Sequence, residues 1–173
     1  MRRPRATHDD GFTLIELLVA ITILGILMAA LTAAIITGLK TTDDTSTRLA
    51  ESHDAQIVQV WWPQDVQSAT DVSTTDTTCG GVTPFARFRW SDVGITKIAS
   101  YTTATSGADR QLVRTYCENG AIQTTIVVAH HLAATGPSLS CSSACSGTPR
   151  TAAITVTEAS GYSYTVGGTR RAT

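Results

Sequence analysis

Residues 11 to 31 read GFTLIELLVAITILGILMAAL, and the apolar run that begins here continues to Leu39 with Glu16 as its one charged residue. At about 1.5 Å rise per residue, the run from Phe12 to Leu39 forms a helix about 42 Å long. The hydrocarbon core of a membrane is about 30 Å thick. The sequence therefore predicts a membrane-spanning helix over residues 12–39.

Glu16 lies near the start of this run, where an uncompensated charge is costly. An acidic or basic side chain at the centre of a membrane costs about 2.5–3.5 kcal/mol. Cleavage between Gly11 and Phe12 would create a new α-amino group one helical turn before Glu16. That ammonium, on the same subunit or a neighbour, is the cation that this end offers the carboxylate. The pattern predicts a membrane anchor whose Glu16 also directs assembly.

The sequence GFTLIE at residues 11–16, followed by an apolar helix, resembles the type III signal of type IV pilins and pseudopilins. The resemblance covers about residues 11–39. It implies cleavage after Gly11 by prepilin peptidase, N-methylation of Phe12, and assembly with other pilins or pseudopilins in a filament. A plain membrane anchor is the alternative, but it does not need Gly-Phe followed by Glu at the fifth position of the new chain.

The charges before the apolar run predict its orientation. Three arginines precede it, at positions 2, 3 and 5, and the positive-inside rule keeps residues 1–11 in the cytoplasm. A secretory signal peptide competes with this interpretation, but the apolar segment is too long and no small-x-small cleavage site follows it. We expect a single-pass protein of the cytoplasmic membrane, with an extracytoplasmic C-terminal domain that reaches the cell surface after filament assembly.

The remaining sequence predicts an α+β fold with four segments. These are a cleaved leader (1–11), a transmembrane and assembly helix (12–39), an amphipathic helical extension (40–70) and an extracytoplasmic antiparallel β domain (71–173). A long helix packed on one face of an antiparallel sheet is a common layered arrangement. The net charge of −1 provides no strong field for nucleic acid or acidic partners.

The helical extension carries its own apolar pattern. Its packed face is predicted from apolar residues at helical spacing: Leu49, Ile57, Val60 and Trp61. Pro63 lacks a backbone donor, so the helix is expected to kink or end near Trp62, with a last turn or two over residues 65–69. At least one indole of the Trp61–Trp62 pair is expected beneath the sheet, although a carbohydrate platform is the functional alternative.

Short strands are predicted after this helix. The candidate strands cover 85–90, 95–103, 111–116, 122–129, 154–157 and 162–166, with loops at 70–81 and 138–150. In the first strand, Phe88 and Trp90 alternate with two arginines on the polar side, Arg87 and Arg89. Asn119-Gly120 is a strong hairpin signal because both residues tolerate positive φ.

The four cysteines all follow the membrane segment: Cys79, Cys117, Cys141 and Cys145. An even number outside the membrane predicts two disulfides, and four cysteines allow three pairings. In one of them Cys141 and Cys145 close a small loop, which leaves Cys79 for Cys117. A metal site is the alternative, but a single CxxxC is a weak signal.

No motif predicts an enzyme, a metal or a cofactor. The sequence contains no nucleophile elbow, HExxH, phosphate loop or paired-carboxylate motif. His130 and His131 end a predicted strand, where neighbours point to opposite faces, so a structural or solvent-facing pair is expected. Arg170-Arg171 is expected to be a solvated end, with a DNA contact as the alternative.

The second half is similar to minor pilins, in particular the W-type minor pilins of type IV pili and the J-type minor pseudopilins of type II secretion. The similarity rests on short motifs in order: DVxxA at 65–69, IxxY at 98–101, LVR at 112–114 and GTRR at 168–171. The membrane segment also lacks the proline common in major pilins. The tip-most minor subunit of type II secretion usually lacks the acid that this chain has as Glu16, so Glu16 argues against that subunit. The alternatives are an adhesive or DNA-binding minor pilin, a subunit that holds an exported protein, and a solitary anchored domain.

Overall fold

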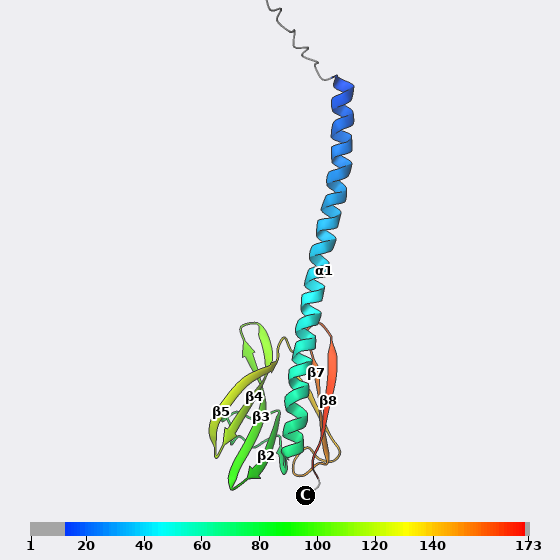
Figure 1. Ribbon diagram of the computed structural model, residues 1–173. Coiled ribbons are helices and arrows are strands. Elements are labelled where there is room, and N and C mark those ends of the chain that lie inside the picture. The colour runs from blue at the N-terminus through cyan, green and yellow to red at the C-terminus, as the bar shows by residue number, and fades with distance from the viewer. Residues whose placement is uncertain (1–12, 172–173) are drawn as a thin grey trace, which may run out of the picture. The chain divides into compact units, whose positions relative to one another are not determined.

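The computed structural model describes residues 13–171 and divides into two compact units, residues 1–47 and 48–173. Helix α1 (Leu14–Ser68) runs through the boundary between them. The described part of the first unit is the beginning of α1. The second unit contains the last turns of α1 and all the described strands (Figure 1).

From Leu14 to Leu39, helix α1 is apolar apart from Glu16, and its threonine hydroxyls are satisfied locally. Threonine hydroxyls donate to helix carbonyls three or four residues earlier, as Thr22 does to Val19 at 2.8 Å and Thr32 does to Met28 at 2.8 Å. A hydroxyl that bonds within its own helix needs no water, so such residues fit an apolar solvent. The threonines therefore do not interrupt the membrane-spanning character predicted for this segment.

Pro63 lies inside α1, and the helix continues past it to Ser68. Of the two outcomes expected at Pro63, an end of the helix near Trp62 is wrong, whereas the further helical turn expected over residues 65–69 is present as far as Ser68. Proline removes one helical hydrogen bond, but the neighbouring turns are fixed by tertiary contacts: Trp62 and Val66 are buried, and Asp65 is held in an ion pair. These contacts offset the missing bond.

The strands form two antiparallel sheets, where the sequence had predicted one. The five-stranded sheet has the order β1 (Asp71–Ser73), β2 (Ala86–Asp92), β3 (Ile95–Ser106), β4 (Asp109–Glu118), β5 (Ala121–Ala129). The three-stranded sheet has the order β6 (Ser138–Cys141), β7 (Thr151–Thr157), β8 (Ser163–Thr169). The α+β class, with a long helix packed on antiparallel strands, is confirmed.

Two strands fall in segments that the sequence predicted as loops. Strand β1 lies in 70–81 and pairs with β2, with Val72 opposite Phe88; β6 lies in 138–150 and pairs with β7. Both are short and polar, so they lack the alternating pattern that marks a strand. Their pairing partners decide their structure, because backbone groups beside a free edge gain ladder hydrogen bonds whatever the side chains are.

The hairpin turns agree with their sequence signals. Asn119 and Gly120 have φ of 47° and 83°, and they connect β4 to β5 as predicted. Strands β3 and β4 form the predicted hairpin, but they are longer than expected: Ser106 still pairs with Asp109. This extended hairpin forms the middle of the five-stranded sheet.

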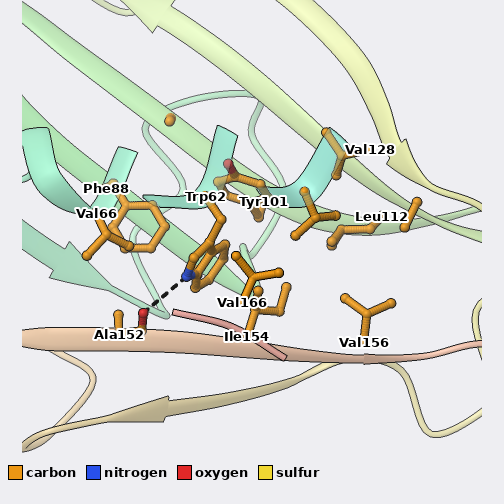
Figure 2. Packing of buried hydrophobic residues seen from close by; sticks show 14 of the residues in the cluster. Trp62, Val66, Phe88, Tyr101, Leu112, Val128, Ala152, Ile154, Val156 and Val166 are labelled. Atoms are coloured by element: carbon orange, nitrogen blue, oxygen red, sulfur yellow. Dashed lines mark hydrogen bonds between the residues drawn. The ribbon is translucent and has the colours of Figure 1, made fainter. Parts of the chain in front are cut away.

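Trp62 is the centre of the core, and it contacts both sheets (Figure 2). Its ring centroid is 5.0 Å from those of both Phe88 and Tyr101, on β2 and β3. Its Nε1–H donates to the carbonyl of Ala152 on β7 at 3.1 Å. The prediction that one indole is buried is confirmed, and the indole N–H has the partner that burial requires.

The packed face of α1 differs from the predicted face. Leu49 and Val60 are exposed, and Ile57 and Trp61 are only half-buried. The buried residues of the helix are three apolar and three acidic ones: Val58, Trp62, Val66, Glu51, Asp54 and Asp65. A pattern that counts only apolar residues places the face wrongly, because each of these acids finds a partner in the domain.

Candidate functional site

The N-terminal segment is the first candidate site. Gly11 and Phe12, the predicted cleavage and methylation residues, lie outside the described residues. Thr13 is the last residue before the helix, and its Oγ1 accepts the backbone N–H of Glu16 at 3.3 Å. This is the geometry of an N-cap, in which a hydroxyl satisfies one of the free donors of the first turn. Thr13 therefore defines where the helix starts, and Glu16 lies in its first turn.

The helical surface that follows is exposed and apolar. Every residue from Thr13 to Ala50 is exposed, and those up to Leu39 include more than ten large hydrophobic side chains. Among the described residues, α1 is the one helix long and apolar enough to cross a membrane. A continuous apolar surface of this size needs a lipid or protein environment to cover it.

Residues 7–32 match the family model described as the prokaryotic N-terminal methylation motif. The matched span includes Gly11, Phe12 and Glu16, and it overlaps the start of the apolar helix. The chain thus has a prepilin-type N-terminus. The motif and the long helix together support the pilin and pseudopilin family, as the sequence resemblance had predicted. No curated protein and no solved structure matched the chain.

Two disulfides link the β domain, as predicted. Cys79 pairs with Cys117 across 38 residues, and Cys141 pairs with Cys145 across four. The first pair is buried beside Ile98 and ties the segment after β1 to strand β4. All four cysteines are thus engaged in disulfides, and the described residues contain no group of three His, Cys, Asp or Glu side chains that could hold a metal ion.

The two adjacent histidines follow β5 and bind separate acids. The backbone N–H of His130 donates to Asp54 Oδ2 at 2.6 Å, and its ring Nδ1 is 3.1 Å from Asp54 Oδ1. The ring Nδ1 of His131 is 3.0 Å from Asp109 Oδ1. The predicted structural role fits these contacts. His130 connects the end of β5 to the helix, which the sequence did not indicate.

The terminal arginines also make contacts that the sequence did not predict. Arg170 Nη1 donates to the carbonyl of Thr70 at 3.2 Å, and the backbone N–H of Arg171 donates to that of Gln67 at 3.4 Å. Arg170 is half-buried and Arg171 is exposed, so the pair remains open to solvent while Arg170 makes this one side-chain contact. These bonds fix the end of the chain to the C-terminal end of α1, where helix carbonyls lack partners.

Arg87 is buried, although the alternation in β2 placed it on the polar side. Its guanidinium lies 2.9 Å from Asp71 Oδ2 and 2.6 Å from Asp76 Oδ2. Hydrogen bonds from Thr78 lower the pKa of the Asp76 carboxyl, with a further contribution from the Arg87 charge. A buried cation needs such partners, and both acids come from the segment that the sequence predicted as a loop.

The strongest polar cluster joins α1 to the five-stranded sheet. Arg114 donates from Nε to Asp65 Oδ2 at 2.7 Å and from Nη2 to Asp65 Oδ1 at 2.8 Å. Tyr101 Oη donates to Asp65 Oδ2 at 2.6 Å. Burial and the Asp65 charge raise the pKa of Tyr101. Burial is the largest single effect and lowers the pKa of Arg114, but the hydrogen bond and charge of Asp65 together with Tyr101 outweigh it, and the net shift is upward.

A second acidic cluster lies where α1 meets the β7–β8 hairpin. Glu51 accepts a hydrogen bond from Ser160, while Glu158 is 3% exposed and its Oε1 has no partner among the described residues. Burial, together with the charges of Asp54 and Glu51, raises the pKa of Glu158 to about 7. The nearby Tyr164 hydroxyl is also buried and makes no hydrogen bond with the described residues. This junction is therefore sensitive to pH.

Proposed function

We propose that this protein is a minor pilin or minor pseudopilin, a structural subunit of a type IV pilus or a type II secretion-like filament. Prepilin peptidase cleaves it after Gly11, Phe12 is N-methylated, and the mature subunit assembles with other pilins through helix α1. The protein supplies structure and has no catalytic role.

The match of residues 7–32 to the methylation motif carries this proposal. The exposed apolar surface of α1 supports it, because the same surface suits lipid before assembly and neighbouring helices afterwards. Glu16 lies in the first helical turn, one turn after the expected new N-terminus. Pairing with the Phe12 ammonium of an adjacent subunit would remove most of the cost of a carboxylate in lipid.

The cysteines support an extracytoplasmic position for the β domain. Disulfides persist in oxidising compartments and are rare in the cytosol, and the domain has two. The arginines before the apolar run favour a cytoplasmic leader. We therefore propose that the leader faces the cytoplasm and that residues 48–173 lie outside the membrane.

The minor subtype rests on weaker sequence features. The membrane segment contains no proline, and the short motifs of the second half follow the order found in minor subunits. Of these motifs, the structure brings three together at one residue: Asp65 of DVxxA binds both Arg114 of LVR and Tyr101 of IxxY. Quantitative mass spectrometry of purified filaments tests the subtype. A minor subunit is present at a small fraction of the major pilin, and equal abundance would contradict it.

Processing is tested by N-terminal sequencing of the protein from its native membranes. The mature chain is expected to begin at N-methylated Phe12. Gly11→Leu should block cleavage because the peptidase requires a small residue there, whereas Gly11→Ala should retain partial cleavage and serves as the matched control. Mature chains that begin beyond Leu39 would exclude the pilin function.

A further inference from the structure

A cavity of about 360 Å³ opens on the surface of the second unit. Its wall combines the last turns of α1 with side chains from the five-stranded sheet, among them Trp61, Gln64, Trp90, Arg114, Tyr116 and Thr124. The volume lies within the range of small-ligand sites, which are lined by aromatic groups with a few polar ones. None of the interactions proposed for filament assembly uses this cavity.

Three aromatic rings and a guanidinium form a row along the cavity. The Arg114 guanidinium carbon is 4.4 Å from the Trp61 ring centroid and 5.6 Å from that of Tyr116. The Tyr116 ring stacks on Trp90, with 6.1 Å between centroids and 29° between planes. All three rings are half-buried. Aromatic surface is thus left available to a ligand, rather than enclosed as in the core around Trp62.

The polar groups of the cavity retain hydrogen-bonding capacity. Arg114 is 5% exposed, and Asp65 engages its Nε and Nη2. Its Nη1 makes no hydrogen bond with the described residues and is not among the buried atoms that lack a partner, so this donor is open to solvent or to a ligand. The side chains of Gln64 and Thr124 are exposed and likewise unbonded within residues 13–171. These groups are placed to bind hydroxyl groups.

The charge balance of the cavity disfavours a polyanion. Arg114 is neutralised by Asp65, and Lys97 lies 2.9 Å from Asp92. Glu118, which accepts the Tyr116 hydroxyl at 2.7 Å, adds a further negative charge. Nucleic acid binding relies on unpaired cations that neutralise phosphates, and this surface offers none. A ligand here needs an apolar face for the rings and neutral hydroxyl groups for the donors.

We propose that this cavity binds a neutral saccharide. The C–H faces of separate sugar rings stack on the Trp90 and Trp61 rings, while the hydroxyl groups of the saccharide bond to Arg114 Nη1, Gln64 and Thr124. The proposal goes beyond the filament function and does not depend on it, because every contact lies within residues 48–173. Loss of assembly and loss of saccharide binding are therefore separate outcomes.

Full-length protein in a detergent without a sugar headgroup is titrated with neutral glucose and N-acetylglucosamine oligosaccharides, uronate oligosaccharides and a 12-nucleotide dT strand. Intrinsic tryptophan fluorescence and ligand-observed NMR report binding. We expect a neutral oligosaccharide to bind with saturation and to change the tryptophan emission. Binding of the uronate or dT ligands alone would overturn the proposal, as would no binding to any ligand, which would leave the aromatic row as a cover for Asp65.

Variants of the cavity locate the binding. Trp90→Ala and Gln64→Ala should each weaken it by about tenfold or more, because one removes a stacking surface and the other a donor. Gln64 is exposed, so its variant tests the site even if Trp90→Ala disturbs folding. Tyr162→Ala, which removes an exposed aromatic ring outside the cavity, is the matched control. Unchanged affinity in both cavity variants would show that the saccharide binds elsewhere.

Discussion

Asp65 and Arg114 form a bidentate ion pair between helix α1 and strand β4, with Nε–Oδ2 and Nη2–Oδ1 distances of 2.7 and 2.8 Å. Both side chains are nearly inaccessible to solvent. The pair joins the second half of α1 to the middle of the five-stranded sheet. Because both charges are buried, removal of either residue leaves the other as an unpaired buried charge. The resulting loss of unfolding free energy can be measured.

Asp65→Ala should therefore destabilise the domain strongly. The change leaves Arg114 buried without its partner, which costs about 3–5 kcal/mol of unfolding free energy. The exposed Lys97–Asp92 pair provides the control: Asp92→Ala should cost less than about 1 kcal/mol. Urea unfolding followed by circular dichroism compares the two. Equal losses would mean that Asp65 and Arg114 interact no more strongly than a surface pair.

Gly168 marks a close approach between β8 and α1. A Cβ added there would lie 2.6 Å from the Val66 Cβ and 2.9 Å from its Cγ1, whereas at Gly167 its nearest neighbour is the Ala153 Cβ at 3.9 Å. Gly168→Ala should cost about 1–3 kcal/mol through overpacking. Gly167→Ala, the matched control, should have little effect. Thermal unfolding of both variants distinguishes a real close approach from a general effect of alanine in β8.

The two disulfides should differ in their contribution to stability. Cross-linking a longer loop removes more entropy from the unfolded chain, so the 38-residue closure predicts about 4 kcal/mol and the four-residue closure about 2 kcal/mol. We compare Cys79→Ser/Cys117→Ser with Cys141→Ser/Cys145→Ser by chemical denaturation. Non-reducing mass spectrometry of the native protein provides the control. Four free thiols would contradict both pairings.

Glu158 predicts a pH dependence of stability. Its pKa rises from 4.5 to about 7 on folding, so the folded state binds this proton more tightly than the unfolded state. The contribution of Glu158 to stability is fully present below pH 4.5 and is lost as the pH rises through 7, a loss of about 3 kcal/mol. Glu158→Gln should remove this loss.

The measurement is the difference in unfolding free energy between the wild type and Glu158→Gln from pH 5 to pH 8. Acids that do not interact with Glu158 cancel in that difference. Asp44→Asn, at an exposed helical position, is the control and should leave the pH profile unchanged. If the Glu158→Gln difference stays constant across this range, the carboxyl group does not titrate there.

Glu16→Ala should leave membrane insertion intact and impair assembly. Removing the carboxylate eliminates a cost of about 2.5–3.5 kcal/mol in lipid, but it also removes the proposed partner of the Phe12 ammonium. Glu16→Gln keeps the side-chain size and loses the charge. The share of each variant in sheared filaments is measured beside wild-type siblings. Wild-type incorporation of Glu16→Ala would show that charge pairing does not recruit the subunit.

The sequence predicted the features that depend on local chemistry. The apolar run after Gly11 favours a helix because its residues are apolar and uninterrupted, and residues 11–16 lie within the span that matches the N-terminal methylation motif whatever the domain does. Asn119-Gly120 determines a turn because both residues accept positive φ. Each of these conclusions requires only residues that are close in the sequence.

Tertiary structure decided the features that depend on distant partners. The buried face of α1 includes Asp54 and Asp65 because His130 and Arg114, which lie 76 and 49 residues further along the chain, meet them. The helix continues through Pro63 because contacts with both sheets fix the turns beside it. Strand β1 forms because its backbone pairs with that of β2. A charge can be buried, or a polar segment ordered, only when a partner removes the cost, and local sequence does not show which partner the fold will bring.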